Sequence, residues 1–223
     1  MSNTPVSGTE HTTTVVIGAG LSGLAVASEL SRYGVGSIVV DGLDILGSSV
    51  LSSSTGLLPR CDIADPASLQ ERSEIMRHLR NYAASHSLDV RNNTRAVRLD
   101  LIGDTAAARF DAGLEPSVPG CPTRQWAVHT AQGVLFADHI VVTRCGQSQL
   151  RRMLADLGIA LGQNFVAAMR AIGMHLVGVG ELITPTPKEV LRQAKVVGQA
   201  ISAKVYPDSV QAALTGSFAA VPA

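Results

Sequence analysis

The chain has 223 residues, of which 46% are hydrophobic and 16% charged, and its 18 basic residues balance 18 acidic ones. A neutral chain of this size can bury a full core, and it lacks the basic excess expected of a protein that binds nucleic acid or an anionic membrane. Three separated cysteines without a C-x-x-C pair give no support for a redox dithiol or a zinc ribbon; they favour reduced thiols in the cytoplasm.

The N-terminal residues 1–13 are polar and predict a flexible lead-in, because they contain neither a basic start nor an apolar run typical of a signal peptide. No apolar run elsewhere reaches the roughly 18 residues of a membrane span. We therefore expect a cytoplasmic protein with no membrane partner.

Residues 14–42 have the pattern of one βαβ unit. A β-branched strand at Val15–Ile17 precedes a helix over about 22–33, for which Gly34 is the expected C-cap. A second β-branched strand at Ser37–Val40 ends at Asp41. This strand–helix–strand order gives weight to the glycines that stand between the first strand and the helix.

Those glycines form a G-x-G-x-x-G sequence, whose residues are Gly18, Ala19, Gly20, Leu21, Ser22 and Gly23. Gly18 makes a tight turn, Gly20 lets the backbone approach a pyrophosphate, and Gly23 lets the helix pack closely on the strand. Asp41 lies about twenty residues on, where a carboxylate accepts hydrogen bonds from a ribose diol and repels a 2′-phosphate. The motif predicts an adenine dinucleotide other than NADP; the alternative is a Rossmann unit whose site has been lost.

The rest of the chain predicts a long amphipathic helix, a β-meander and a final strand–helix pair. The expected elements are a helix over 67–86, a meander over about 91–136 with a Gln132-Gly133 turn, strands at 140–142 and 174–177, and a helix over 188–204. Thr186 is the expected N-cap of the last helix, with Pro187 at its first position. The fold class is α/β, a Rossmann-like parallel sheet with a β-meander insertion, in one domain over 14–205 followed by a tail over 206–223.

The β-meander favours FAD over NAD as the cofactor, because a nicotinamide dehydrogenase would continue with further strand–helix units. The segments "WAVHTAQGVLFADHIVVTRCG" and "GMHLVGVGELITP" are similar to the meander end, hinge strand and flavin-contacting strand of the two-dinucleotide-binding flavoproteins. The chain most closely resembles the FAD domain of the flavin monooxygenase and Baeyer–Villiger-like group, within the pyridine nucleotide-disulfide oxidoreductase-like proteins. The resemblance implies FAD as cofactor, a helix start at Thr186–Lys188 facing the flavin, and further contacts at Gly42, Gly47, Val97, Gly146, Gly178 and Gly180.

The chain departs from that family in four places. Only about thirty residues separate Cys145 from Met174, where the family inserts an NAD(P)H-binding domain with its own glycine fingerprint. The segment "ILGSSV" lacks the second glycine and the aromatic residue of the family, "TRCG" replaces "ATG", and "GVG" replaces Gly-Asp. Hydride delivery from a nicotinamide domain of this chain is therefore not expected.

Other side chains give weaker signals. Arg60 and Cys61 follow the Gly/Ser-rich loop and could face a flavin, although packing or solvent exposure is the commoner outcome. The six histidines have no metal-ligand spacing, His175 and Trp126 read as core residues, and no G-x-S-x-G elbow supports acyl transfer. The sequence does not predict catalytic residues or a metal site.

Three functions remain open. The first is a small FAD-dependent oxidoreductase or monooxygenase-like enzyme that acts on a small organic substrate, its flavin being reduced by a separate donor such as a reductase. The second is a repurposed flavoprotein fold that performs cyclisation, isomerisation or dehydration with a structural flavin or none. The third is a flavin-domain subunit of a heteromeric complex; an apolar patch where the inserted domain is missing would also favour a homo-oligomer.

Overall fold

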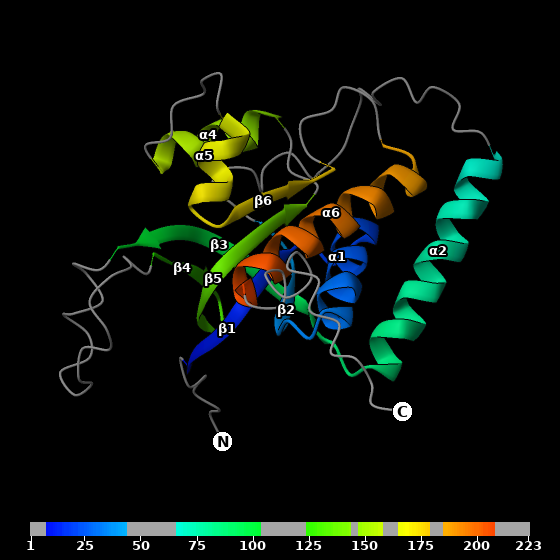
Figure 1. Cartoon of the computed structure of the whole chain (residues 1–223), viewed down its shortest axis with the longest axis horizontal. Coiled ribbons are helices and arrows are strands. Elements are labelled where there is room, and N and C mark those ends of the chain that lie inside the picture. Colours follow the sequence, from blue (N-terminus) through cyan, green and yellow to red (C-terminus); the bar gives the residue numbers. More distant parts are fainter. Residues whose placement is uncertain are drawn as a thin grey trace, which may run out of the picture.

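The computed structural model describes residues 8–43, 66–103, 124–143, 147–157, 165–178 and 185–207. The elements in these ranges are, in chain order, β1 (Gly8–Ile17), α1 (Leu21–Arg32), β2 (Ser37–Leu43), α2 (Pro66–Ser85), β3 (Asp89–Ile102), β4 (Gln125–Thr130), β5 (Gly133–Thr143), α4 (Gln147–Asp156), α5 (Phe165–Ala171), β6 (Met174–Val177) and α6 (Pro187–Val205). Helices α1, α2 and α6 lie on one side of the strands, and α4 and α5 lie on the other (Figure 1). The fold is mixed α/β, with a six-stranded, mostly parallel sheet, as predicted.

The six strands are joined in a ring with one branch. Strand β1 pairs in parallel with β2 on one side and β5 on the other, and β2 pairs in parallel with the first part of β3. The second part of β3 pairs antiparallel with β4, which pairs antiparallel with β5, and this closes the ring. Strand β6 extends the parallel part of the sheet beside the end of β5. The predicted meander is therefore present as β3, β4 and the first half of β5.

Strand β1 is longer than the sequence predicted. Residues 8–13, expected to be part of a flexible lead-in, form its first half, and Gly8–Thr12 pair with Gly133–Ala137 of β5. Strand β5 is also longer: the predicted segments 134–136 and 140–142 are one continuous strand. Side chains at the start of β1 are exposed, so backbone pairing and not an apolar pattern holds this segment in the sheet.

Alternating side chains of the parallel strands fill two cores. One face of the sheet carries Val15, Ile38 and Ile140, which pack with Trp126 and other meander residues. The opposite face carries Val16, Val39 and Val141, which pack against α1 and α6. Strands buried on both faces are typical of a parallel sheet between two layers. The expected burial of Trp126 is confirmed, since its side chain has no exposed surface.

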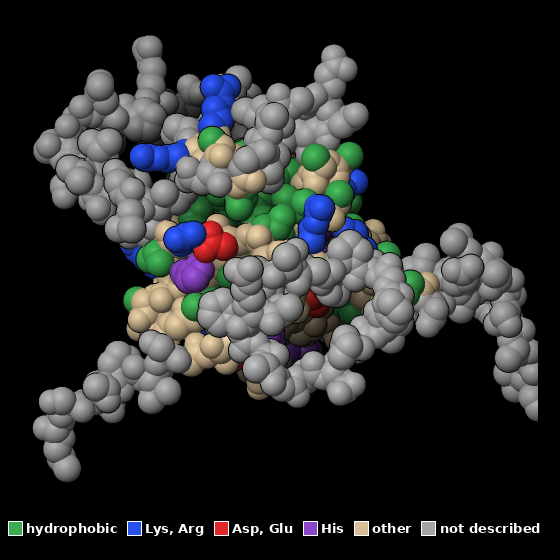
Figure 2. All heavy atoms as spheres, turned by 90° about the vertical axis from the view of Figure 1, so that its left-hand side faces the viewer, with side chains coloured by type: hydrophobic (Ala, Val, Ile, Leu, Met, Phe, Trp, Pro, Cys, Tyr) green, Lys and Arg blue, Asp and Glu red, His purple; other side chains and the backbone are tan. Residues whose placement is uncertain are grey.

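Helices α4 and α5 close the first core on the side of β6. Leu150, Met153 and Leu154 of α4 and Met169 of α5 are buried against the strand residues of that core. On the face turned toward the viewer in Figure 2, hydrophobic side chains gather at the centre with Lys and Arg side chains around them. These two short helices were not predicted from the sequence.

The helix ends follow the sequence signals. The C-cap of α1 is Tyr33, one residue earlier than predicted, and Gly34 follows it with φ +70°, a left-handed conformation that glycine adopts at low cost. Thr186 is the N-cap of α6, where its Oγ1 accepts a hydrogen bond from the Glu189 amide at 3.3 Å, and Pro187 is the first helical residue. Within the described ranges, no helix has the length and apolar character needed to cross a membrane.

Candidate functional site

The turn between β1 and α1 is held against β2 by its backbone. The Gly18 amide donates a hydrogen bond to the Val40 carbonyl oxygen at 2.8 Å, and the Ala19 amide donates to that of Asp41 at 3.2 Å. Gly18 has φ +120°, which side-chain-bearing residues rarely adopt. An ideal Cβ at Gly18 would also lie 2.1 Å from Oγ1 of Thr143. Backbone conformation and close contact therefore both require glycine here.

The third glycine of the motif packs against the first. An ideal Cβ at Gly23 would lie 1.7 Å from the Gly18 carbonyl oxygen and 3.5 Å from Cγ1 of Val16. The first turn of α1 therefore crosses directly over the end of β1. This is the close helix–strand packing that the sequence predicted for Gly23.

The N-terminus of α1 presents backbone amides at the same place. Gly20 is the N-cap and provides no side-chain cap, and the first turn carries no acidic residue. The first helical hydrogen bond runs from the Leu24 amide to the Gly20 carbonyl oxygen, so the amides of Leu21, Ser22 and Gly23 have no acceptor within the helix. Together with the positive end of the helix dipole, these amides suit a phosphate group.

Thr143, at the end of β5, fixes this turn from the other side. Its Oγ1 donates a hydrogen bond to the Ile17 carbonyl oxygen at 2.9 Å and lies 3.4 Å from the Gly18 carbonyl oxygen. The Thr143 side chain is buried, with 5% of the residue exposed. In the sequence Thr143 stands out only as part of "TRCG", a departure from the resembling family, whereas the structure gives it a positioning role.

Asp41 lies at the end of β2 in contact with β3. Its Oδ2 accepts a hydrogen bond from Nε of Arg95 at 3.0 Å, and Arg95 is opposite Gly42 in the β2–β3 register. The side chains are 37% exposed for Asp41 and 63% exposed for Arg95. An ideal Cβ at Gly42 would meet no atom of the described residues within 4 Å. Arg95 was not predicted as a site residue, because nothing in the local sequence pattern indicates that β3 pairs with the end of β2.

Val97 lies where β3 leaves β2 and joins β4. Ala96 pairs with Leu43 of β2 and with Thr130 of β4, and the next β3–β4 pair is Arg98 with His129. Val97 is thus the extra residue of a β-bulge, and its backbone is left out of the regular ladder. The predicted cofactor contact at Val97 falls on a half-buried bulge close to the end of β2.

Gly178, which directly follows β6, meets the glycine turn. It has φ +65°, and an ideal Cβ there would lie 3.3 Å from Oγ of Ser22 and 3.7 Å from Cγ of Pro185. Its amide donates a hydrogen bond to Oε1 of Gln193 on α6 at 3.0 Å. The structure therefore brings together Gly178 and Ser22, two of the predicted cofactor contacts.

The start of α6, expected to face a flavin, carries one cation and one anion. Lys188 is 83% exposed and its Nζ lies 3.5 Å from Oε1 of Glu71 on α2. Glu189 is hydrogen-bonded by Arg192, which lowers the pKa of the Glu189 carboxyl and raises that of the guanidinium.

Five other predicted positions lie outside the described residues, namely Gly47, Arg60, Cys61, Gly146 and Gly180.

The described site residues gather at one edge of the sheet. Gly18 and Gly178 follow β1 and β6, while Asp41 and Thr143 lie at the ends of β2 and β5. These are the carboxyl ends of parallel strands, the edge at which open α/β sheets bind ligands. The arrangement can hold a pyrophosphate at the start of α1 and a ribose diol at Asp41.

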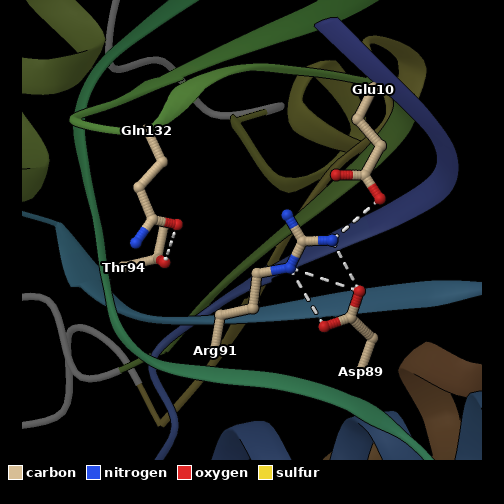
Figure 3. Close-up of polar contacts among 5 residues, drawn as sticks. All are labelled: Glu10, Asp89, Arg91, Thr94 and Gln132. Atoms are coloured by element: carbon tan, nitrogen blue, oxygen red, sulfur yellow. Dashed lines mark hydrogen bonds and ion pairs between the residues drawn. The ribbon is translucent and has the colours of Figure 1, made fainter. Parts of the chain in front are cut away.

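A second polar cluster lies at the opposite end of β1 (Figure 3). Arg91 of β3 donates hydrogen bonds to Asp89 and to Glu10, and these contacts raise the pKa of Arg91 and lower that of Glu10. Thr94 donates to Oε1 of Gln132 at 2.7 Å. An open cavity of about 360 Å³ lies there, lined by Glu10, Arg91, Gln132 and their neighbours. Since Gly8 also lines it, this cavity is at the amino end of β1, away from the glycine turn.

Two buried histidines on neighbouring strands, His139 of β5 and His175 of β6, have their rings in an edge-to-face arrangement. The ring centroids of His139 and His175 are 5.9 Å apart, and neither Nδ1 of His139 nor Nε2 of His175 has a hydrogen-bond partner within the described residues. Burial lowers the pKa of His139, and burial together with the nearby His139, Lys204 and Arg170 lowers that of His175 to about 4. The predicted core position of His175 is confirmed, because only 4% of it is exposed.

The sequence matches no protein-family model and no curated protein. Among solved structures, THI4 from Thermovibrio ammonificans is similar over 87% of this chain and 90% of that one, with a TM-score of 0.53 and 15% identity. A thioredoxin reductase from Gloeobacter violaceus is similar over 60% of this chain and 37% of its own length (TM-score 0.34, 15% identity). A flavin-containing monooxygenase from Stenotrophomonas maltophilia is similar over 61% and 39%, respectively (TM-score 0.34, 21% identity).

The similarity to THI4 extends over nearly the whole of both chains and shows a shared fold. The chain spans well under half the length of the thioredoxin reductase and of the monooxygenase. The similarity to THI4 therefore supports the Rossmann-like α/β fold.

Proposed function

We propose that the chain binds FAD at the carboxyl edge of its sheet and is a small flavin-dependent oxidoreductase of the monooxygenase-like kind. The observation that carries this proposal is the packing of Gly23 on Gly18, which fixes the start of α1 over the end of β1. The same turn is hydrogen-bonded to Asp41 through the Ala19 amide, and Ser22 lies against Gly178. The pyrophosphate would lie on the amides of Leu21 to Gly23, and the ribose diol on Asp41.

The bulge at Val97 supports an adenine position next to the ribose. Its backbone is not part of the regular ladder, and it directly follows the residues that pair with the end of β2. A backbone amide and carbonyl in that place would offer one donor and one acceptor to the edge of a purine. Bound there, the flavin would supply the redox chemistry, and the protein would supply position and electrostatics.

The electron donor is proposed to be a separate molecule. Between β5 and β6 the described chain contains only the helices α4 and α5, and the sequence has no second G-x-G-x-x-G. A separate reductase, diffusing NAD(P)H or the small organic substrate itself would therefore reduce the flavin. The same observation favours the second candidate, a fold repurposed for cyclisation, isomerisation or dehydration in which the flavin is structural or absent.

The visible absorbance spectrum of the purified chain, before and after addition of FAD, tests the proposal. A flavin spectrum that bleaches on anaerobic addition of NADH or NADPH supports the oxidoreductase. A flavin spectrum that does not bleach favours the structural role or a partner reductase. A colourless protein that takes up no FAD contradicts the proposed cofactor.

Two variants locate the bound flavin. Asp41→Asn removes the negative charge and one of the two acceptor oxygens, and it should weaken FAD binding roughly tenfold, the effect of losing one charge-assisted hydrogen bond. Asp100→Asn is the matched control, since Asp100 is also paired with an arginine of β3, Arg98, but lies in the β3–β4 part of the sheet. Equal weakening in both variants would contradict the assignment of Asp41.

A further inference from the structure

The ion pair between Asp41 and Arg95 changes the charge of the proposed ribose site. An isolated Asp41 carboxylate would repel a 2′-phosphate. In the structure Arg95 Nε lies 3.0 Å from Asp41 Oδ2, so that the pair has no net charge. The selection of nucleotides at this edge therefore depends on two residues, whose partnership is set by the β2–β3 register.

Arg95 has the chemistry of a phosphate ligand. A guanidinium presents five N–H donors in a planar fork that matches phosphate oxygens. Of the three guanidinium nitrogens of Arg95, only Nε makes a hydrogen bond to a described residue, and the side chain is 63% exposed. Its terminal nitrogens thus have no hydrogen-bond partner among the described residues and belong to an exposed side chain.

Arg95 also lies close to the β-bulge at Val97. Arg95 is two residues before Val97, and it is opposite Gly42, the residue that follows Asp41. A nucleotide that extends from the glycine turn over the end of β2 toward Val97 must pass Asp41 and Arg95. The 2′ position of its ribose would then lie close to both charged groups.

We propose that Asp41 and Arg95 together determine selectivity for the 2′ substituent of the bound nucleotide, with Arg95 as a phosphate-binding group that Asp41 neutralises. This inference rests on the proposed dinucleotide site. Asp41 selects the free 2′-hydroxyl by accepting its hydrogen bond and by holding Arg95. Without the carboxylate, the same guanidinium binds a 2′-phosphate.

The test uses the full chain, freed of nucleotide, titrated calorimetrically with ADP-ribose and with ADP-ribose 2′-phosphate. We expect the wild type to favour ADP-ribose, and Asp41→Asn to lower this preference roughly 10- to 100-fold, mainly through tighter binding of the 2′-phosphate. The double variant Asp41→Asn/Arg95→Gln should not bind the 2′-phosphate more tightly than the wild type does. Arg95→Gln alone should increase the preference for ADP-ribose, because the compensating charge is removed.

Arg98→Gln is the matched control, because Arg98 is on the same strand, is 72% exposed and is paired with Asp100. It should leave the preference unchanged. Two outcomes would overturn the role of Arg95 without affecting the dinucleotide site. One is tighter 2′-phosphate binding in Asp41→Asn that is retained in Asp41→Asn/Arg95→Gln. The other is an unchanged preference for ADP-ribose in Arg95→Gln. If the wild type bound none of the three ligands, FAD, ADP-ribose and ADP-ribose 2′-phosphate, the dinucleotide site and this inference would both be overturned.

Discussion

The carbonyl oxygen of Gly18 occupies the space that a side chain at Gly23 would need, with only 1.7 Å between that oxygen and an ideal Cβ. Backbone atoms cannot rotate away as a flexible side chain can. The contact therefore joins the end of β1 to the start of α1 with little tolerance for change.

Replacement of Gly23 by alanine should lower the free energy of unfolding by about 3 kcal/mol, at the upper end of the cost of overpacking a core. The helix must move away from the strand, so FAD binding should be lost as well. Urea denaturation and FAD titration measure the two effects. Gly103→Ala is the control, because an ideal Cβ at Gly103 meets none of the described atoms within 4 Å. Similar losses in both variants would contradict the importance of the Gly18–Gly23 contact.

Replacement of Thr143 by valine should lower the free energy of unfolding by about 1 kcal/mol, the net value of one hydrogen bond. The variant keeps the shape of the side chain but removes the hydroxyl that donates to the Ile17 carbonyl oxygen. FAD affinity should also decrease, because the glycine turn loses this support. Thr143→Ser retains the hydroxyl and should retain most of the affinity; equal weakening by valine and serine would argue against the hydrogen bond.

Gly178→Ala and Gly34→Ala form a matched pair at the two ends of α1. Their φ angles are +65° and +70°, so alanine should cost each about 1 kcal/mol of stability. Of the two, Gly178 approaches Ser22, whereas the one described neighbour of an ideal Cβ at Gly34 is the Tyr206 hydroxyl, at 3.9 Å. We expect roughly tenfold weaker FAD binding for Gly178→Ala alone. Equal FAD affinities in the two variants would place Gly178 outside the site.

The buried histidine pair predicts a loss of stability in acid. Burial and the charges of His139, Lys204 and Arg170 lower the pKa of His175 from 6.5 to about 4, whereas Asp138 acts in the opposite sense on His139. The unfolded chain therefore binds the proton more readily than the folded chain, and stability is lost as pH falls from about 6.5 through about 4. The loss from His175 amounts to up to ~3 kcal/mol.

Denaturant unfolding across this pH range measures the effect. His175→Gln cannot take up the proton and should show a shallower loss of stability between these pH values. His78→Gln, on the exposed face of α2, is the control and should follow the wild type. An unchanged slope in His175→Gln would assign the acid sensitivity to other groups.

The glycine turn, Asp41 and the three long helices could be predicted, because their signals lie within short stretches of sequence. Gly18 to Gly23 act within one turn, and Thr186 caps the helix that it begins. The apolar spacing of Leu150, Met153 and Leu154 could have indicated α4, although the helix is short.

Arg95 and Thr143 could not be assigned in the same way. Arg95 reaches Asp41 across 54 positions and Thr143 reaches Ile17 across 126, so their roles depend on strand register. The first half of β1 was missed for a related reason. Its side chains are exposed and carry no alternation, and its place is set by backbone pairing with β5.

The ring of strands also constrains the order in which the chain acquires its structure during synthesis. Strand β1 is made first, yet one of its two neighbours, β5, emerges from the ribosome more than a hundred residues later, and the hydroxyl that supports the glycine turn comes with it. Closing such long-range pairs carries a large entropic cost and slows folding. The glycine turn therefore cannot acquire its hydrogen bond from Thr143 until more than a hundred residues after β1 have been synthesised.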